Sequence, residues 1–287
     1  MNDQSKKTCL ACGSRQTTDL YWVKSPILEN REFLLHECGN CRSRFFDPEE
    51  HDISIPEENA KFSLSEHYLS AEFVPNPYWL HQVKMIRKLS SRPIRRILDC
   101  GCRTGDFLMH WESTIDRTGV EVVPEVAAAA RRRGIAVINE SLEQTKITKR
   151  YDVVTCYAIL EHLTRPDAVL QALCEAVEDG GLLVIMVPSF QTLKARLLEA
   201  VRMHWHQLYP PFHLGYFSRE FLTDATTRRG FEHITSVYTS GGMFNPLDGV
   251  PVVGAVWARG MNFIDQHSPS RFLPIFDHMY MYFRRTS

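Results

Sequence analysis

Four cysteines near the start of the chain form two pairs whose spacing suits a metal ion. Cys9 and Cys12 make one C-x-x-C unit, Cys38 and Cys41 make a second, and 25 residues separate the two units. Each C-x-x-C turn directs two thiolates toward one point, so two turns supply the four sulfur ligands of a tetrahedral zinc ion. Because thiolates fill all four positions, the pattern predicts a structural zinc site rather than a catalytic one.

The segment that carries these cysteines is predicted to be a small zinc-ribbon domain over residues 1–47. The runs 19–23, 33–36 and 45–46 are typical of short strands between and after the two turns. Free thiols or a redox pair are the alternatives to zinc. The simplest role for the metal is to stabilise a segment too small to build its own core, while contact with a substrate, a partner or nucleic acid stays open.

A glycine turn later in the chain has the features of a ligand cradle. Residues 94–98 predict a strand that runs into Asp-Cys-Gly-Cys-Arg-Thr-Gly at 99–105, and a helical pattern begins at Asp106. Glycines allow the backbone to approach a ligand, and a helix N-terminus offers unpaired N–H groups. The strand, turn and helix therefore predict a binding site at the carboxyl end of a parallel strand.

An acidic residue follows at the distance expected for a nucleotide site. Glu121 lies 20 residues after Gly101, at the end of a predicted strand over 119–122, and an acid at this offset reaches ribose hydroxyls. A dinucleotide fingerprint would need further glycines at 103 and 106, where this chain has Arg103 and Asp106. The match to a dinucleotide enzyme is therefore poor.

The turn with Gly101 and Gly105 resembles motif I of the class I S-adenosylmethionine-dependent methyltransferases. Three later segments are similar to the same family: a strand and loop at 151–163, a glycine pair before the strand at 182–188, and a helix capped by Ser218. The resemblance covers roughly residues 60–240. It implies an α/β fold with a Rossmann-like seven-stranded methyltransferase sheet, preceded by the small zinc ribbon.

The resemblance also divides the chain. Residues 48–92 are expected to form a linker and N-terminal helices, and residues 93–287 the methyltransferase domain. Within the latter, 241–278 is a candidate lid or cap, and 279–283 a final antiparallel strand, with a C-terminal helix as the alternative. 

Residues at the cofactor site are implied by the same resemblance. Glu121 would hold both ribose hydroxyls, and Arg103 stands where the family has its middle glycine, so it could pair with the cofactor carboxylate, turn to solvent or block the pocket. Tyr68 is a candidate lid aromatic or a core residue. The full set is Tyr68, Asp99, Gly101, Cys102, Arg103, Gly105, Glu121, Val122, Ser141, Leu142, Cys156 and Tyr157.

Methyl transfer to a hydroxyl or carbon acceptor usually needs a general base, for which histidine is suited. His213 and His162 are the candidates, and a structural role in holding their loops is the alternative for each. The expected reaction is in-line transfer from S-adenosylmethionine to a small-molecule acceptor, metabolite or sugar-like, at oxygen. The rivals are an RNA or protein methyltransferase that grips its substrate with the ribbon, and a non-catalytic cofactor-binding or scaffold protein, suggested by Arg103.

Charge and hydropathy narrow these choices. The 287 residues contain 33 Lys and Arg against 34 Asp and Glu, a formal net charge of −1. That balance gives no overall basic surface for nucleic acid or an acidic membrane. The sequence shows neither a signal-like apolar segment nor a run of about 18 apolar residues, so we expect a cytoplasmic protein without a membrane span.

Overall fold

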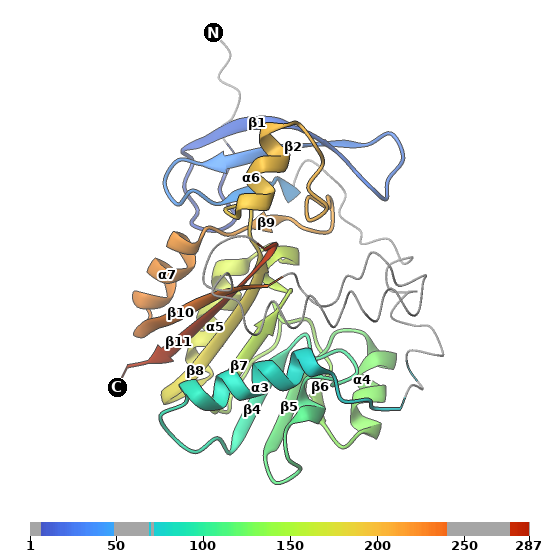
Figure 1. The fold of residues 1–287 in the computed structure, drawn as a ribbon, viewed down its shortest axis with the longest axis vertical. Coiled ribbons are helices and arrows are strands. Elements are labelled where there is room, and N and C mark those ends of the chain that lie inside the picture. Colours follow the sequence, from blue (N-terminus) through green and yellow to red (C-terminus); the bar gives the residue numbers. More distant parts are fainter. Residues whose placement is uncertain (1–6, 49–68, 70–71, 240–275, 287) are drawn as a thin grey trace.

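A seven-stranded sheet forms the centre of the larger part of the molecule (Figure 1). The computed structural model describes residues 7–48, 69, 72–239 and 276–286. The strand order is β10-β11-β8-β7-β4-β5-β6. Their bounds are β4 Arg96–Cys100, β5 Asp116–Val120, β6 Ala136–Ile138, β7 Tyr151–Tyr157, β8 Val177–Pro188, β10 Phe231–Thr239 and β11 His278–Arg285.

Strands β6, β5, β4, β7 and β8 are parallel, and β11 lies antiparallel between β8 and β10. Successive side chains of the central strands pack into hydrophobic cores on opposite faces of the sheet, because side chains alternate in direction along a strand. Leu98 and Val154 pack on one face, while Ile97 and Val153 pack on the other. The expected seven-stranded α/β sheet is confirmed, and its last strand is β11 rather than a C-terminal helix.

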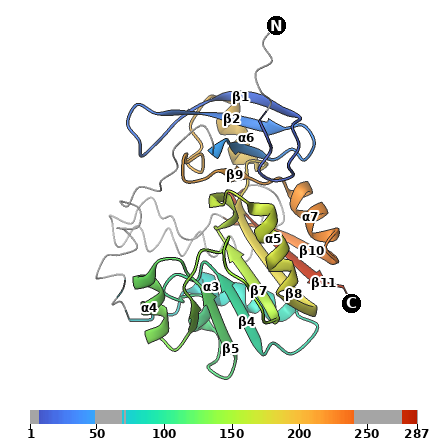
Figure 2. The ribbon, with the colours of Figure 1, turned by 180° about the vertical axis from the view of Figure 1, so that it is seen from behind.

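Helices cover both faces of this sheet, with α3 in front in Figure 1 and α5 in front in Figure 2. Three of them, α3, α4 and α5, begin with proline, whose fixed φ suits the first helical turn. The helices are α3 Pro77–Leu89, α4 Pro124–Arg132, α5 Pro166–Glu175, α6 Leu193–Ala200 and α7 Arg219–Thr227. Ser218 caps α7, as expected, and accepts a hydrogen bond from the Phe221 amide at 3.0 Å.

The helix expected from Asp106 is wrong. Turns follow the glycine turn, and only Leu108–His110 is helical, as a single 3₁₀ turn (η2). The next strand already starts at Asp116, which leaves too little chain for an α-helix and the connection back to the sheet. A hydrogen bond between His110 Nδ1 and the Asp106 carbonyl, at 2.7 Å, closes the short turn instead.

The N-terminal cysteines belong to a second, four-stranded sheet. Three of its strands match the expected runs: β1 Thr17–Lys24, β2 Glu32–Cys38 and β3 Arg44–Phe46. The fourth, β9 Gly215–Tyr216, comes from the far larger C-terminal part of the chain and pairs with β3. The N-terminal sheet is therefore completed by the domain that follows it.

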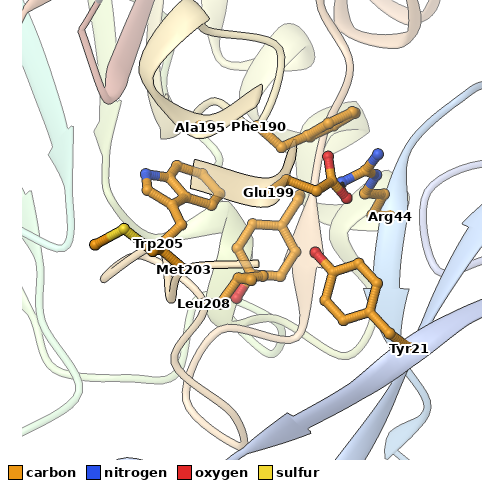
Figure 3. Close-up of a pocket in the computed structure, with 9 residues that line it drawn as sticks. Tyr21, Arg44, Phe190, Ala195, Glu199, Met203, Trp205 and Leu208 are labelled. Atoms are coloured by element: carbon orange, nitrogen blue, oxygen red, sulfur yellow. Dashed lines mark hydrogen bonds and ion pairs between the residues drawn. The ribbon is translucent and has the colours of Figure 1, made fainter. Parts of the chain in front are cut away.

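Side chains from both parts also meet beside α6 (Figure 3). Arg44 on β3 forms an ion pair with Glu199 of α6 at 2.9 Å, and its guanidinium lies 4.6 Å from the centre of the Phe190 ring. Tyr21 borders the same small cavity of about 20 Å³, and burial raises the pKa of its hydroxyl to about 12. A partly buried ion pair and a cation–ring contact thus hold the N-terminal sheet against α6 and the segment before it.

Within the described residues, no helix combines the length and the apolar character needed to cross a bilayer.

Candidate active site

The glycine turn lies at the carboxyl end of β4 and takes a backbone shape that favours glycine. Gly101 has φ +79° and Gly105 has φ +83°. A Cβ on Gly101 would lie 2.3 Å from Ile159 Cδ1, and one on Gly105 would lie 2.1 Å from Ile135 Cδ1. Arg103 also has a positive φ, +51°, although its side chain is exposed. The turn therefore keeps its left-handed geometry where arginine replaces glycine.

Glu121 follows β5, and two backbone amides hold its buried carboxylate. Arg103 N donates to Oε2 at 3.0 Å, and Val123 N donates to Oε1 at 2.9 Å. A carboxylate has about four lone-pair sites, so this arrangement leaves each oxygen able to accept a further hydrogen bond. Glu121 is only 8% exposed, so the unused acceptor positions of its carboxylate are sheltered from solvent.

A cavity of about 330 Å³ connects these residues. That volume falls within the range of small-molecule sites. Its lining comprises Trp79, Asp99, Gly101, Cys102, Arg103, Asp106, Phe107, Glu121, Tyr157, Ala158, Ile159 and His162. The cavity sits where β4, β5 and β7 end, the edge at which open parallel sheets bind ligands.

Asp99 is the last acidic residue of β4 and is fully buried at the floor of this cavity. Burial, together with the nearby Glu121, raises the pKa of its carboxyl to about 7, while a hydrogen bond from Thr155 Oγ1 at 2.7 Å opposes the shift. The carboxyl of Asp99 therefore changes charge near neutral pH.

Residues 57–236 match a family of methyltransferase domains. The chain belongs to this family. The glycine turn, Glu121 and the seven-stranded sheet are thus parts of a methyltransferase, and the expectation of an S-adenosylmethionine-dependent methyltransferase is confirmed.

Relatives and solved structures agree with this assignment. The methyltransferase is 28% identical over 171 residues to a ubiquinone biosynthesis O-methyltransferase of Bordetella avium, covering 52% of this chain and 70% of that one. It is 31% identical over 154 residues to the protein of that name from Salmonella arizonae, covering 47% and 61% of the two chains.

Two solved structures show the same fold at low identity. The plantazolicin methyltransferase BamL gives a TM-score of 0.53 at 15% identity, with 80% of this chain and 91% of that one covered. The magnesium protoporphyrin IX methyltransferase of Synechocystis PCC 6803 gives 0.52 at 13% identity, with 80% and 97% covered.

The structure brings together part of the predicted cofactor set. Asp99, Gly101, Cys102, Arg103, Glu121 and Tyr157 all line the cavity. Gly105 instead packs against Ile135, and Cys156 is fully buried within β7. Val122 is 59% exposed, and Ser141 and Leu142 are partly buried after β6, outside the cavity lining. Tyr68 and residues 241–275 of the expected lid lie outside the described residues.

Three aromatic side chains line the cavity together, and of these only Tyr157 was predicted from the sequence. The rings of Trp79, Phe107 and Tyr157 lie 5.2 to 5.3 Å apart, centre to centre. Trp79 belongs to α3, whereas Phe107 follows the glycine turn and Tyr157 ends β7. Trp79 and Phe107 were missed because these rings come together only through the packing of segments that are distant in the sequence.

The two candidate bases lie side by side, with ring centres 4.9 Å apart. His162 lines the cavity, whereas His213 lies behind it. Each Nδ1 is 2.8 Å from a backbone carbonyl, that of Phe212 for His162 and that of Gln207 for His213. Burial lowers the pKa of His213 to about 3 and lowers that of His162 as well, so both rings are neutral at physiological pH.

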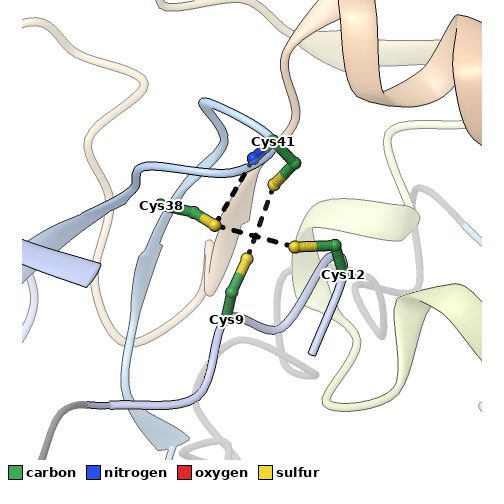
Figure 4. A group of neighbouring side chains, drawn as sticks. All are labelled: Cys9, Cys12, Cys38 and Cys41. Atoms are coloured by element: carbon green, nitrogen blue, oxygen red, sulfur yellow. Dashed lines mark hydrogen bonds between the residues drawn. The ribbon is translucent and has the colours of Figure 1, made fainter. Parts of the chain in front are cut away.

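The four N-terminal cysteines converge on one point (Figure 4). Cys9 Sγ and Cys41 Sγ lie 3.6 Å apart, and so do Cys12 Sγ and Cys38 Sγ. All four sulfurs are within 4.8 Å of one another. Four Zn–S bonds of about 2.3 Å in a tetrahedron place the sulfurs about 3.8 Å apart, so this cluster fits the zinc ion that the spacing predicted.

Proposed function

We propose that this methyltransferase transfers the methyl group of S-adenosylmethionine to an oxygen atom of a small-molecule acceptor. The observation that carries the proposal is Glu121, held by two backbone amides with acceptor sites to spare, beside the glycine turn in one cavity. The names of the O-methyltransferase relatives favour a small acceptor and oxygen as the acceptor atom.

The cavity residues have the chemical groups that S-adenosylmethionine binding requires. The two unused acceptor positions of Glu121 match the two hydroxyl donors of a ribose. Ser141 and Leu142 would lie toward the adenine, and Cys156 and Tyr157 toward the sulfonium. The cofactor supplies a methyl group on positively charged sulfur. The protein then has to align that group with an acceptor, which by itself contributes much of the rate.

Arg103 supports binding rather than a non-catalytic scaffold. Its side chain is exposed, and its backbone amide donates a hydrogen bond to Glu121, the proposed ribose acid. The substitution therefore changes the side chain at this position without removing the interaction that the glycine turn has to make.

His162 and His213 are proposed to accept or hold the acceptor's proton. With each Nδ1 hydrogen given to a carbonyl, each Nε2 keeps its lone pair. Because His162 lines the cavity, it would meet an acceptor bound there, and its ring centre lies 4.9 Å from that of His213.

We further propose that residues 1–47 form a zinc ribbon in which Cys9, Cys12, Cys38 and Cys41 hold one structural zinc ion. Residues 48–92 would then connect it to the methyltransferase domain at 93–287. The ribbon's role is structural, because its sheet and its second cysteine turn are built into that domain through β9 and Ser218.

The reaction is tested with the zinc-loaded protein and S-adenosylmethionine carrying a labelled methyl group. Hydroxylated small molecules, total RNA and a protein extract are offered separately, and products are resolved by mass. Label in a small product, as a methyl ether, supports the proposal. Label only in RNA or protein, or on nitrogen or carbon, contradicts it.

A further inference from the structure

A second cluster of metal-ligand atoms lies directly beside the cofactor cavity. Glu161, His162 and His213 each place one ligand atom within 4.8 Å of the others. Glu161 and His162 end the 3₁₀ turn η3, Leu160–His162, just after β7, whereas His213 precedes β9. A hydrogen bond from the Leu214 amide to the Glu161 carbonyl, at 2.6 Å, joins the two segments.

Glu161 is the most unusual member of this cluster. Its side chain is fully buried, and neither carboxylate oxygen has a hydrogen-bond partner within the described residues. A buried carboxylate without hydrogen bonds is costly, and an adjacent cation is one of the few ways to offset that cost. The oxygens therefore mark a place that a positively charged ligand would stabilise.

In both histidines, Nε2 is available as a metal ligand and carries no hydrogen to donate. A carbonyl only accepts hydrogen bonds, so the contacts of Phe212 O and Gln207 O place the ring hydrogens on Nδ1 of His162 and His213. Nε2 of each ring is then unprotonated, as a metal ligand must be. A second ring nitrogen anchored on a backbone carbonyl is the usual support for a metal-bound imidazole.

We propose that Glu161, His162 and His213 bind a divalent transition-metal ion. Two imidazoles and one carboxylate suit first-row metals such as Fe²⁺, Co²⁺ or Zn²⁺, whereas Mg²⁺ and Ca²⁺ prefer oxygen ligands alone. Three protein ligands leave coordination positions open. This site shares no ligand with the four-cysteine cluster and has no thiolate, which allows the two metals to be told apart.

The position of His162 suggests what the ion does. Because His162 also lines the cavity, an open coordination position would lie close to a bound acceptor. A metal ion there would bind the acceptor's oxygen and favour loss of its proton, and it would then replace the free Nε2 atoms of His162 and His213 in that role. This part of the inference rests on the proposed function, whereas metal binding itself does not.

Cobalt titration of the full chain tests the site, after one equivalent of Zn²⁺ has been added, which four thiolates take in preference to two imidazoles and a carboxylate. We expect one equivalent of Co²⁺ to bind with d–d absorption and without the intense thiolate-to-cobalt band of a cysteine site. Glu161→Gln, of nearly unchanged shape, and His213→Asn should each weaken that binding by about tenfold or more. The exposed His204→Asn should leave it unchanged, and the zinc content of the cysteine cluster serves as the folding control.

Absence of Co²⁺ binding to the parent, or binding that Glu161→Gln and His213→Asn leave intact, would overturn the inference. The titration contains neither S-adenosylmethionine nor an acceptor. A protein that binds Co²⁺ at this site but methylates nothing would count against the proposed function alone.

Discussion

The backbone amide of Arg103 donates a hydrogen bond to Glu121 Oε2 at 3.0 Å. The residue that departs from the glycine of the family's motif thus also positions the acid that follows the next strand. This contact needs only the backbone, so it is compatible with any residue that tolerates φ +51° at this position. The turn thus keeps its left-handed backbone with an arginine at this position.

Arg103→Gly is therefore expected to stabilise the fold. Residues with a Cβ pay about 1–2 kcal/mol in the left-handed region, partly offset by the greater freedom of glycine in the unfolded chain. The matched control is Arg103→Ala, which removes the same side chain but keeps the Cβ. Denaturant unfolding should find the glycine variant more stable than the alanine variant by about 1 kcal/mol. Equal stabilities would show that the backbone here carries no strain.

Asp99 should make stability depend on pH. Its pKa is about 7 in the folded protein against 3.8 for an unperturbed carboxyl, so between these values the folded state binds more protons than the unfolded state. This carboxyl therefore lowers the free energy of unfolding as pH rises from about 4 to 7, by on the order of 2–4 kcal/mol.

Asp99→Asn removes that effect while keeping an acceptor for Thr155. The stability of this variant relative to the parent should rise from pH 4 to pH 7 and then level off. Asp116→Asn, at an exposed position on the adjacent β5, should show no such trend. A stability difference for Asp99→Asn that stays flat across this range would refute the assignment.

Local patterns predicted the strands β4, β7 and β8, which carry their own apolar runs, whereas the seven-stranded sheet was expected from the resemblance to the methyltransferase family. The ribbon strand β9 was not predictable, since the two residues Gly215–Tyr216 have no strand pattern and pair with β3 far away in the sequence. The helix expected from Asp106 does not form, because the chain between the glycine turn and β5 is too short for an α-helix, whatever its residue types.

The residues of the candidate site were also predictable only in part. Gly101 and Glu121 were found from spacing, since their roles depend on short-range backbone geometry. Trp79, Phe107 and Glu161 were missed because they come together only through packing of distant segments. Adenine-side residues such as Ser141 stay predictions.

Cys12→Ser should remove the ribbon's metal. The parent is expected to carry one thiolate-bound zinc per chain, and loss of one of four ligands should reduce that content sharply. Because the ribbon sheet is anchored on the following domain, the melting temperature should fall by more than about 5 °C. Cys174→Ser, at a buried thiol in α5, controls for loss of a sulfur. Metal analysis that finds no zinc in the parent would contradict the ribbon.

Ser218→Ala should cost more than an ordinary helix cap. The hydroxyl accepts from the Phe221 amide at 3.0 Å and donates to the Cys41 carbonyl at 2.7 Å, so its loss also leaves a carbonyl of the cysteine turn unpaired. We expect a loss of about 2–3 kcal/mol. Thr192→Ala removes only a cap on α6 and should cost about 1 kcal/mol. Equal losses would mean that the contact with the ribbon contributes nothing.

The most direct test of the central claim is calorimetry of S-adenosylmethionine binding to the zinc-loaded parent and to Glu121→Ala. We expect one site per chain in the parent and a loss of affinity of about 100-fold or more in the variant, since each of two hydrogen bonds to a charged group contributes about 1.5–3 kcal/mol. Glu125→Ala, at an exposed acid on the neighbouring α4, should bind like the parent. No binding to the folded parent, or equal affinity of the parent and Glu121→Ala, would contradict the account.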